Sequence, residues 1–329
     1  MAPSIDNTFG AGLIGAIVTA ILYGVTSVQT YLYYVNYPKD AKKLKFLVGV
    51  IWVLDTAHVA LVSMCIYHYL VTSFFNPAAL ARIHWSLNLS VLLNVMLAVL
   101  VQGFFTHQVY TISKGVTRWI LVPLLVVLVG LHFVFGIETI VFLFIETSFA
   151  EFQTSETVKL AAATPFAIFA VLSDIVVAGS LCALLHESRT GIGKTNTIIT
   201  SLMIYAVNRC LLTSFVAIVE VIVFVARPHE LWFLGVDFVI GKLYANSLLA
   251  SLNSRNTLRN QQGSGMMSTS IYISADSSDP SNASSGSRGS QGHAVLALKP
   301  MSRDGSTIDD GTPRFGSTGP KVSPDVFAV

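Results

Sequence analysis

Charged residues are scarce in this sequence of 329 residues. Asp, Glu, Lys and Arg together make up 12% of it, whereas 53% is hydrophobic. A soluble domain has about a quarter of its residues charged, so the composition points to lipid as the surroundings of much of the chain. The net charge is only +2, and no Lys/Arg cluster with interleaved aromatic residues is present. We therefore expect no nucleic-acid binding.

Cysteine is equally scarce, and its placement excludes a disulfide framework. Cys65, Cys182 and Cys210 each fall within an apolar run, whereas secreted disulfide domains carry paired cysteines in loops. We interpret the three as small buried hydrophobes. No spacing of His, Cys, Asp and Glu is typical of a metal site, and no catalytic motif is present. The sequence thus predicts no metal, no cofactor and no enzymatic activity.

Long apolar runs are what the sequence has in abundance. Each is close to the roughly 20 residues that a helix needs to cross a bilayer, and none shows the alternation of a barrel strand. The first run follows ten residues without Lys or Arg, so we interpret it as a membrane helix and not as a signal peptide. The fold class predicted is an all-α bundle of seven transmembrane helices. The runs cover about 11–34, 46–70, 85–106, 119–144, 161–185, 198–225 and 231–252.

Basic residues between these runs predict the orientation of the bundle. If the N-terminus is outside, ten basic residues fall on the cytoplasmic side and three on the outer side. This asymmetry favours an outer N-terminus and a cytoplasmic C-terminus. We expect the plasma membrane and not an endomembrane. The inner residues are Lys39, Lys42, Lys43, Lys45, Lys114, Arg118, Arg189, Lys194, Arg255 and Arg259, and the outer ones are Arg82, Lys159 and Arg227.

The composition changes after the last apolar run. Residues 1–253 form the predicted transmembrane domain, and residues 254–329 are rich in Ser, Gly, Thr and Pro. Such a segment buries too little apolar surface to fold, so we expect a disordered cytoplasmic tail. Ser290, Thr312 and Ser323 stand in short kinase-like contexts, where phosphorylation would add charge and could recruit a cytoplasmic partner.

Five ionisable residues fall near the middle of the predicted helices. A charge at this depth is costly unless it faces a partner or water. Two acids, Asp55 and Asp174, then balance two bases, Arg209 and Lys242. Asp237 lies about 140° around the helix axis from Lys242, so Asp237 and Lys242 cannot pair. Asp174 is the first candidate partner of Lys242. The mid-membrane set is Asp55, His58, Asp174, Arg209 and Lys242.

A second group of carboxylates, Glu138, Glu220 and Asp237, lies nearer the outer side. Together with the central residues and Asn246 they are candidates for lining a path for an ion, a proton or a polar ligand. The alternative is that the central pairs only specify helix packing, while the outer acids reach the headgroups. Weaker polar signals are typical of links between helices or of packed side chains. These are Asn88, Asn94, Gln102 and His132.

Two seven-helix classes do not fit the residues. A retinal protein needs a carboxylate one turn before its lysine, but Asp237 is five residues before Lys242 and the third run contains no acid. A rhodopsin-type receptor needs an acidic-Arg-aromatic triplet at the inner end of the third helix, where this chain has Thr106-His-Gln-Val-Tyr110.

The segment from Gly191 to Thr195 resembles the end of a phosphate-binding loop, but it lacks the strand that precedes such a loop.

The last three runs and the segments beside them carry a specific pattern. Its residues are Ser173-Asp174, Ser180-Leu-Cys182, Leu185-His186, Ser188-Arg-Thr-Gly191, Thr195, Leu211-Leu-Thr-Ser214, Lys242-Leu-Tyr244, Asn246-Ser-Leu-Leu-Ala250, Leu252-Asn253 and Arg255. With this pattern the chain resembles, over about residues 167–255, a family of multipass membrane proteins known from basidiomycete fungi, the "domain of unknown function 6534" family. Arg209-Cys210 departs from the family pattern, which has a small or polar residue followed by glycine. The resemblance implies a membrane protein and no particular activity.

These observations support three hypotheses on function. The first is a receptor-like sensor of a small or lipidic ligand, which fits the short outer loops, the polar centre and the modifiable tail. The second is a transporter or proton-coupled carrier that uses the intramembrane Asp and Lys residues. The third is a structural membrane protein in which the charges specify packing. In all three the lipid bilayer is the main partner.

Overall fold

A computed structural model describes residues 6–187, 193–227 and 230–264 of the chain. Within these ranges seven helices are long and apolar enough to cross a membrane, which confirms the predicted all-α fold. No strand occurs there apart from one isolated bridge between Arg82 and Ser148. The long helices are α1 (Ala11–Asn36), α2 (Lys42–Tyr67), α4 (Trp85–Ile112), α5 (Gly115–Ile145), α7 (Thr164–Glu187), α8 (Gly193–Ala226) and α9 (Trp232–Ser264).

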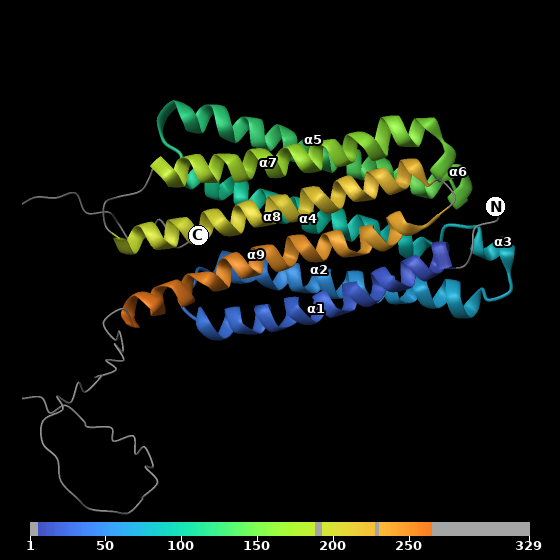
Figure 1. The fold of residues 1–329 in the computed structure, drawn as a ribbon, viewed down its shortest axis with the longest axis horizontal. Helices are drawn as coiled ribbons and strands as arrows, with labels where there is room; N and C mark the ends of the chain where they lie inside the picture. The colour runs from blue at the N-terminus through green and yellow to red at the C-terminus, as the bar shows by residue number, and fades with distance from the viewer. Residues whose placement is uncertain (1–5, 188–192, 228–229, 265–329) are drawn as a thin grey trace, which may run out of the picture. The chain divides into compact units, whose positions relative to one another are not determined.

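Shorter helical turns complete the connections. α3 (Pro77–Leu80) and α6 (Phe149–Thr154) lie in the loops at one end of the bundle (Figure 1). Three π-helical turns lead into α1, extend α2 and lead into α7: η1 (Asp6–Gly10), η2 (His68–Thr72) and η3 (Val158–Ala163). We call the end where α1, α4, α7 and α9 begin the amino end, and the end where they finish the carboxyl end.

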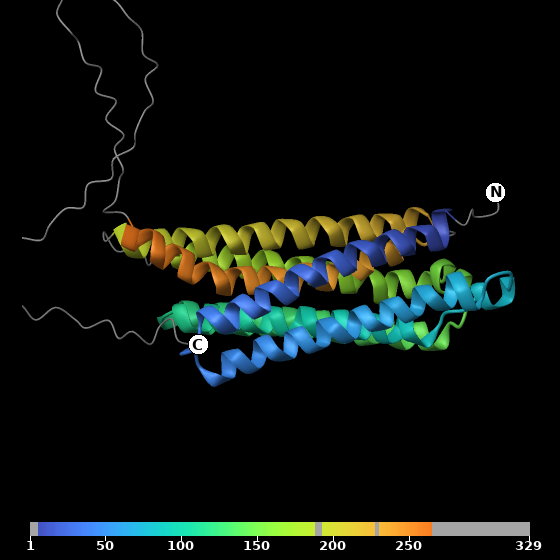
Figure 2. The same ribbon diagram turned by 90° about the horizontal axis from the view of Figure 1, so that it is seen from below.

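α4 and α9 form the centre of the bundle, and the other long helices surround them (Figures 1 and 2). Half of the apolar window of each is buried, against 22% for α5. α9 contacts α1, α2, α4 and α8, so its polar side chains face protein on most sides. The sequence of α5 is the most apolar of the seven, which suits a helix that turns most of its surface to lipid.

Two glycines allow α1 and α9 to approach closely at the amino end. A Cβ atom built on Gly15 would lie 2.4 Å from the Cα atom of Gly235. Small residues at such crossings let backbones touch, which is a main source of helix association in membranes. Further along the pair, the amides of Asn246 and Asn253 donate to the carbonyls of Leu22 (3.2 Å) and Gln29 (2.8 Å). The two donors are seven residues apart on α9, and the two acceptors are seven residues apart on α1, as expected for parallel helices in one register.

This crossing predicts opposite effects for two substitutions on α1. Gly15→Ala should lower the free energy of unfolding by about 1–3 kcal/mol, because the added methyl group meets backbone that must move. Gly24→Ala should be neutral or stabilise by up to ~1 kcal/mol, because no atom lies within 4 Å and alanine favours the helix. Unfolding by SDS titration in mixed micelles measures both. Equal effects of the two substitutions would show that the close approach of α1 and α9 does not contribute to the free energy of unfolding.

α9 continues to Ser264, past the predicted start of the tail at Ser254. The reason lies in its anchors at the carboxyl end. Arg255 forms an ion pair with Asp40 (2.6 Å) and lies over the ring of Tyr37, while Asn253 binds α1. A helix held at this point continues with little nucleation cost. The rest of the predicted tail, residues 265–329 with Ser290, Thr312 and Ser323, lies outside the described residues.

Candidate functional site

Two ion pairs are buried in the middle of the bundle. Lys242 binds Asp55 at 2.5 Å, and Arg209 binds Asp174 at 2.9 Å. The predicted balance of two acids and two bases is therefore present, but the predicted pairing of Lys242 with Asp174 is wrong. Successive polar residues of α9 point to different neighbours: Lys242 faces α2, and Tyr244 faces α7. Positions two apart on a helix do not share a face.

The pair on the α2 side is poorly satisfied. Nζ of Lys242 donates to Oδ1 and to the backbone oxygen of Asp55, and all three of Lys242, Asp55 and His58 are 0% exposed. Within the described part of the chain, Oδ2 of Asp55 and both ring nitrogens of His58 have no hydrogen-bond partner. His58 follows Asp55 by one turn and meets the ring of Phe238 edge-on. Unpaired polar atoms at full burial are costly, so Asp55 and His58 are candidates for a functional role.

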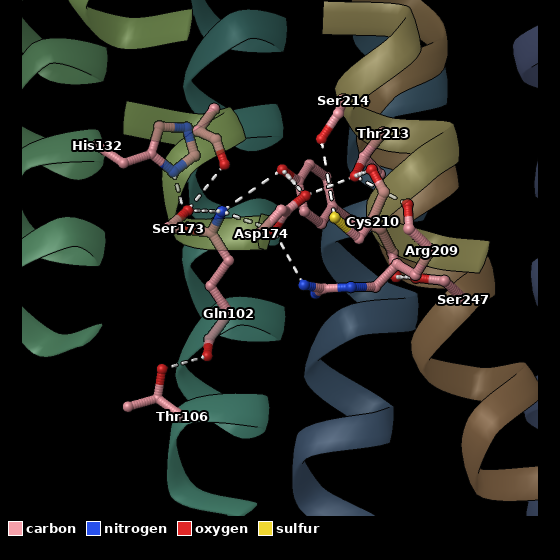
Figure 3. Close-up of polar contacts among 12 residues, drawn as sticks. Gln102, Thr106, His132, Ser173, Asp174, Arg209, Cys210, Thr213, Ser214 and Ser247 are labelled. Carbon is pink, nitrogen blue, oxygen red and sulfur yellow. Dashed lines mark hydrogen bonds and ion pairs between the residues drawn. The ribbon is translucent and has the colours of Figure 1, made fainter. Parts of the chain in front are cut away.

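In the pair on the α7 side, the carboxylate of Asp174 is fully satisfied (Figure 3). Oδ1 of Asp174 accepts from Arg209 (2.9 Å) and Gln102 (3.2 Å), and Oδ2 accepts from Thr213 (2.5 Å) and the Tyr244 hydroxyl (3.0 Å). An ionised carboxylate has about four acceptor positions, and here four donors use them. Asp174 thus has no free position for a proton or a ligand.

Gln102 extends this network to α5. Its Nε2 also donates to Ser173 (2.7 Å), and its Oε1 lies 2.8 Å from Nδ1 of His132. In the sequence Gln102 and His132 gave only weak polar signals. His132 lies near the middle of the predicted run 119–144, whereas Gln102 lies four residues before the end of the predicted run 85–106. Only the longer α4, which continues to Ile112, brings Gln102 towards the middle of its helix. Asn246, a predicted path residue, instead donates to the backbone of Leu22 on α1.

A separate cavity lies nearer the amino end, among α4, α5, α6, α7, α8 and α9. Its volume is about 70 Å³. Carboxylates from two helices line it, Glu220 of α8 and Asp237 of α9, whereas Glu138 is not among its lining residues. The other lining residues are Leu87, Val91, Thr139, Leu143, Phe152, Ala163, Thr164, Phe166, Ala167, Val221, Phe224, Phe233 and Leu234.

The two carboxylates of this cavity differ in their hydrogen-bond partners. Asn94 donates to Oδ2 of Asp237 at 3.3 Å and to its backbone oxygen at 2.7 Å. The carboxylate of Glu220 forms no ion pair and no side-chain hydrogen bond with any residue that the structure describes. Two acidic groups beside one small apolar cavity repel each other when both are charged, and a cation or a shared proton relieves this.

The cavity adjoins a groove on the outer surface of α7 and α8. Thr164, Ala167 and Val221 line both. The groove measures about 290 Å³ and is otherwise walled by aliphatic side chains, among them the exposed Ile168 and Ile222. In a membrane this surface faces acyl chains, so an apolar molecule could reach the cavity sideways from the bilayer.

The fold and its buried polar clusters define an integral membrane protein, whose surroundings are a lipid bilayer and whose described residues include seven helices that can span it. Residues 170–257 match the family model described as "Family of unknown function (DUF6534)", which confirms the predicted resemblance over this part of the chain. No curated protein and no solved structure matches the chain.

The matched region includes the residues that tie α9 to the other helices. Lys242 binds α2, Tyr244 binds Asp174 of α7, and Asn246 and Asn253 bind α1. Arg255 binds Asp40 in the loop between α1 and α2. The contacts that hold α9 at the centre of this bundle therefore involve residues within the matched region.

Proposed function

We propose that this protein is a receptor-like sensor that binds a small or lipidic ligand in the cavity beside Glu220 and Asp237. The observation that carries the proposal is the combination of apolar walls, two convergent carboxylates and a neighbouring groove on the lipid-facing surface. Ligand sites are mostly apolar, with a few polar groups that fix orientation. Two acids in such a site favour a ligand with a cationic amine and an apolar body.

The position of the cavity suggests how binding could reach the opposite end. Glu220 shares α8 with Arg209, and Asp237 shares α9 with Lys242. A cation that draws the two carboxylates together would move α8 and α9 relative to the partners of their ion pairs on α7 and α2. We further propose that the amino end faces outside, that the protein resides in the plasma membrane, and that the tail recruits a cytoplasmic partner.

Dodecylamine, dodecanol and dodecanoate test the site, because they share one chain length and differ in head group. Dodecylamine should raise the melting temperature of the purified protein by several degrees, and the neutral and anionic compounds should not. In Glu220→Gln and in Asp237→Asn the apparent affinity for dodecylamine should fall about tenfold, since each substitution removes one charge from a partly buried ionic contact. The exposed Glu151→Gln at the same end is the control.

Equal shifts with dodecanol, or an unchanged amine response in both variants, would remove the carboxylates from the ligand site. A sensing role further requires that the amine change the binding of a partner to the tail. Flux of the amine across proteoliposomes without such a change would identify a carrier.

A proton-coupled carrier is the second candidate, favoured by the unpaired Oδ2 of Asp55 and the unpaired ring of His58. Protons need groups with free positions, which Asp55 and His58 have and Asp174 lacks. In proteoliposomes whose outside is made more acidic than the lumen, wild-type protein should then acidify the lumen. The variant His58→Gln should not acidify the lumen, although its melting temperature should be unchanged. Absence of proton movement in the wild type would leave these groups a structural role only.

A further inference from the structure

A groove between α1 and α2 lies on the outer surface of the bundle towards the carboxyl end. The two helices are neighbours along one edge (Figures 1 and 2). The groove measures about 610 Å³ and is lined by Thr30 and Tyr34 of α1 and by a stretch of α2 that includes Lys45, Gly49 and Trp52. Its walls are mainly apolar, and the aromatic ring of Trp52 is partly exposed at its margin.

Uncompensated positive charge surrounds one end of this groove. Lys39, Lys42 and Lys43 are exposed in the loop and first turn of α2, next to Lys45. The one acidic residue between residues 37 and 45 is Asp40, and its carboxylate is already paired with Arg255. An anion therefore meets several lysines and no free carboxylate from this segment.

The start of α2 adds backbone donors at the same place. Ala41 occupies the N-cap and has no side chain that could accept a hydrogen bond from the first turn. The first amide groups of a helix lack partners within the helix, and together with the helix dipole they favour a phosphate group. Here that helix start coincides with the lysines, and both features favour a phosphate group at this place.

One residue that lines the groove also carries an unpaired polar atom. Thr30 is 7% exposed, and its Oγ1 has no hydrogen-bond partner within the described residues. An ester or glycerol oxygen is the kind of group that could pair with this hydroxyl. Donors thus lie at the end and along the side of an otherwise apolar groove.

We propose that α1 and α2 bind one anionic phospholipid of the bilayer. Its phosphate lies at the start of α2 among Lys42, Lys43 and Lys45, and one acyl chain follows the groove towards Trp52. At 1.5 Å per residue, the distance from Lys42 to Trp52 is roughly 15 Å, which an acyl chain can span. The site is separate from the amino-end cavity and does not depend on the function proposed for it.

Trp52 provides a local probe of the bound lipid. The chain has four tryptophans, and the other three are Trp85, Trp119 and Trp232, all exposed at helix starts. Replacing these three with phenylalanine leaves Trp52 as the sole tryptophan. This protein is placed in phosphatidylcholine nanodiscs that contain an equal small fraction of brominated phosphatidylglycerol or brominated phosphatidylcholine, and quenching of Trp52 is measured.

Brominated phosphatidylglycerol should quench Trp52 at a several-fold lower mole fraction than brominated phosphatidylcholine. Lys42→Gln combined with Lys43→Gln should remove most of this preference, so that the two lipids quench at nearly equal mole fractions, because each lysine near an anionic lipid contributes to its affinity. Both lysines are exposed, so the variant should keep its fold. A protein with Trp85 alone, at the amino end, should show equal quenching by the two lipids.

Three results would overturn the proposal. The first is equal quenching of Trp52 by both lipids, and the second is a preference that survives loss of the lysines. The third is loss of the preference when inorganic phosphate is added at constant ionic strength, which would assign the site to a soluble anion.

Discussion

Replacing Lys242 with methionine should lower the free energy of unfolding by about 3–5 kcal/mol, and adding Asp55→Asn should restore much of this loss. The single substitution leaves a carboxylate at 0% exposure with no cation beside it. The single change Asp55→Asn leaves the ammonium group equally isolated. In the double variant neither charge remains, so the cost of burying one disappears.

A double-mutant cycle measured by SDS titration gives the coupling between the two side chains. The control is Arg227→Met, which breaks an exposed ion pair with Glu230 and should cost no more than about 1 kcal/mol. Additive losses at Lys242 and Asp55 would mean that the two charges do not compensate each other in the folded protein.

Asp174→Asn should destabilise the protein more than Arg209→Met, although the two residues form one ion pair. Loss of Asp174 leaves the buried guanidinium with no anion, and its Nε and Nη1 already lack partners within the described residues. We expect about 3–5 kcal/mol for this change. Loss of Arg209 leaves a carboxylate that still accepts from Gln102, Thr213 and Tyr244, so about 2 kcal/mol less is expected.

The same titration, with Tyr244→Phe as a matched variant, tests this asymmetry. Tyr244→Phe removes one neutral donor from Asp174 and should cost about 1–2 kcal/mol. Equal losses for Asp174→Asn and Arg209→Met would show that the three remaining donors do not stabilise the carboxylate. Greater loss for Arg209→Met would point instead to its packing over the ring of Phe105.

The span positions could be predicted because they depend on local composition. A run such as 85–106 is apolar enough to be recognised without any knowledge of its neighbours, and the structure places α4 over Trp85–Ile112. The burial of Asp55, Asp174, Arg209 and Lys242 followed from the same counting, since depth in a membrane depends on distance along one helix. The outer position of Glu220 and Asp237 was predicted in the same way, but their shared cavity was not.

The partners of these residues depend on how the helices are ordered around α9. Depth alone makes Asp55 and Asp174 equivalent partners for Lys242, and the rotation of α9 between α2 and α7 separates them. That rotation results from non-local contacts, among them the Gly15–Gly235 crossing and the amides of Asn246 and Asn253 on α1. The sequence by itself determined seven helices that are long and apolar enough to cross a membrane, and it predicted which charges lie near the middle of their helices. Only the tertiary structure decided which charges meet, because a helix's neighbours are chosen by packing across the whole bundle.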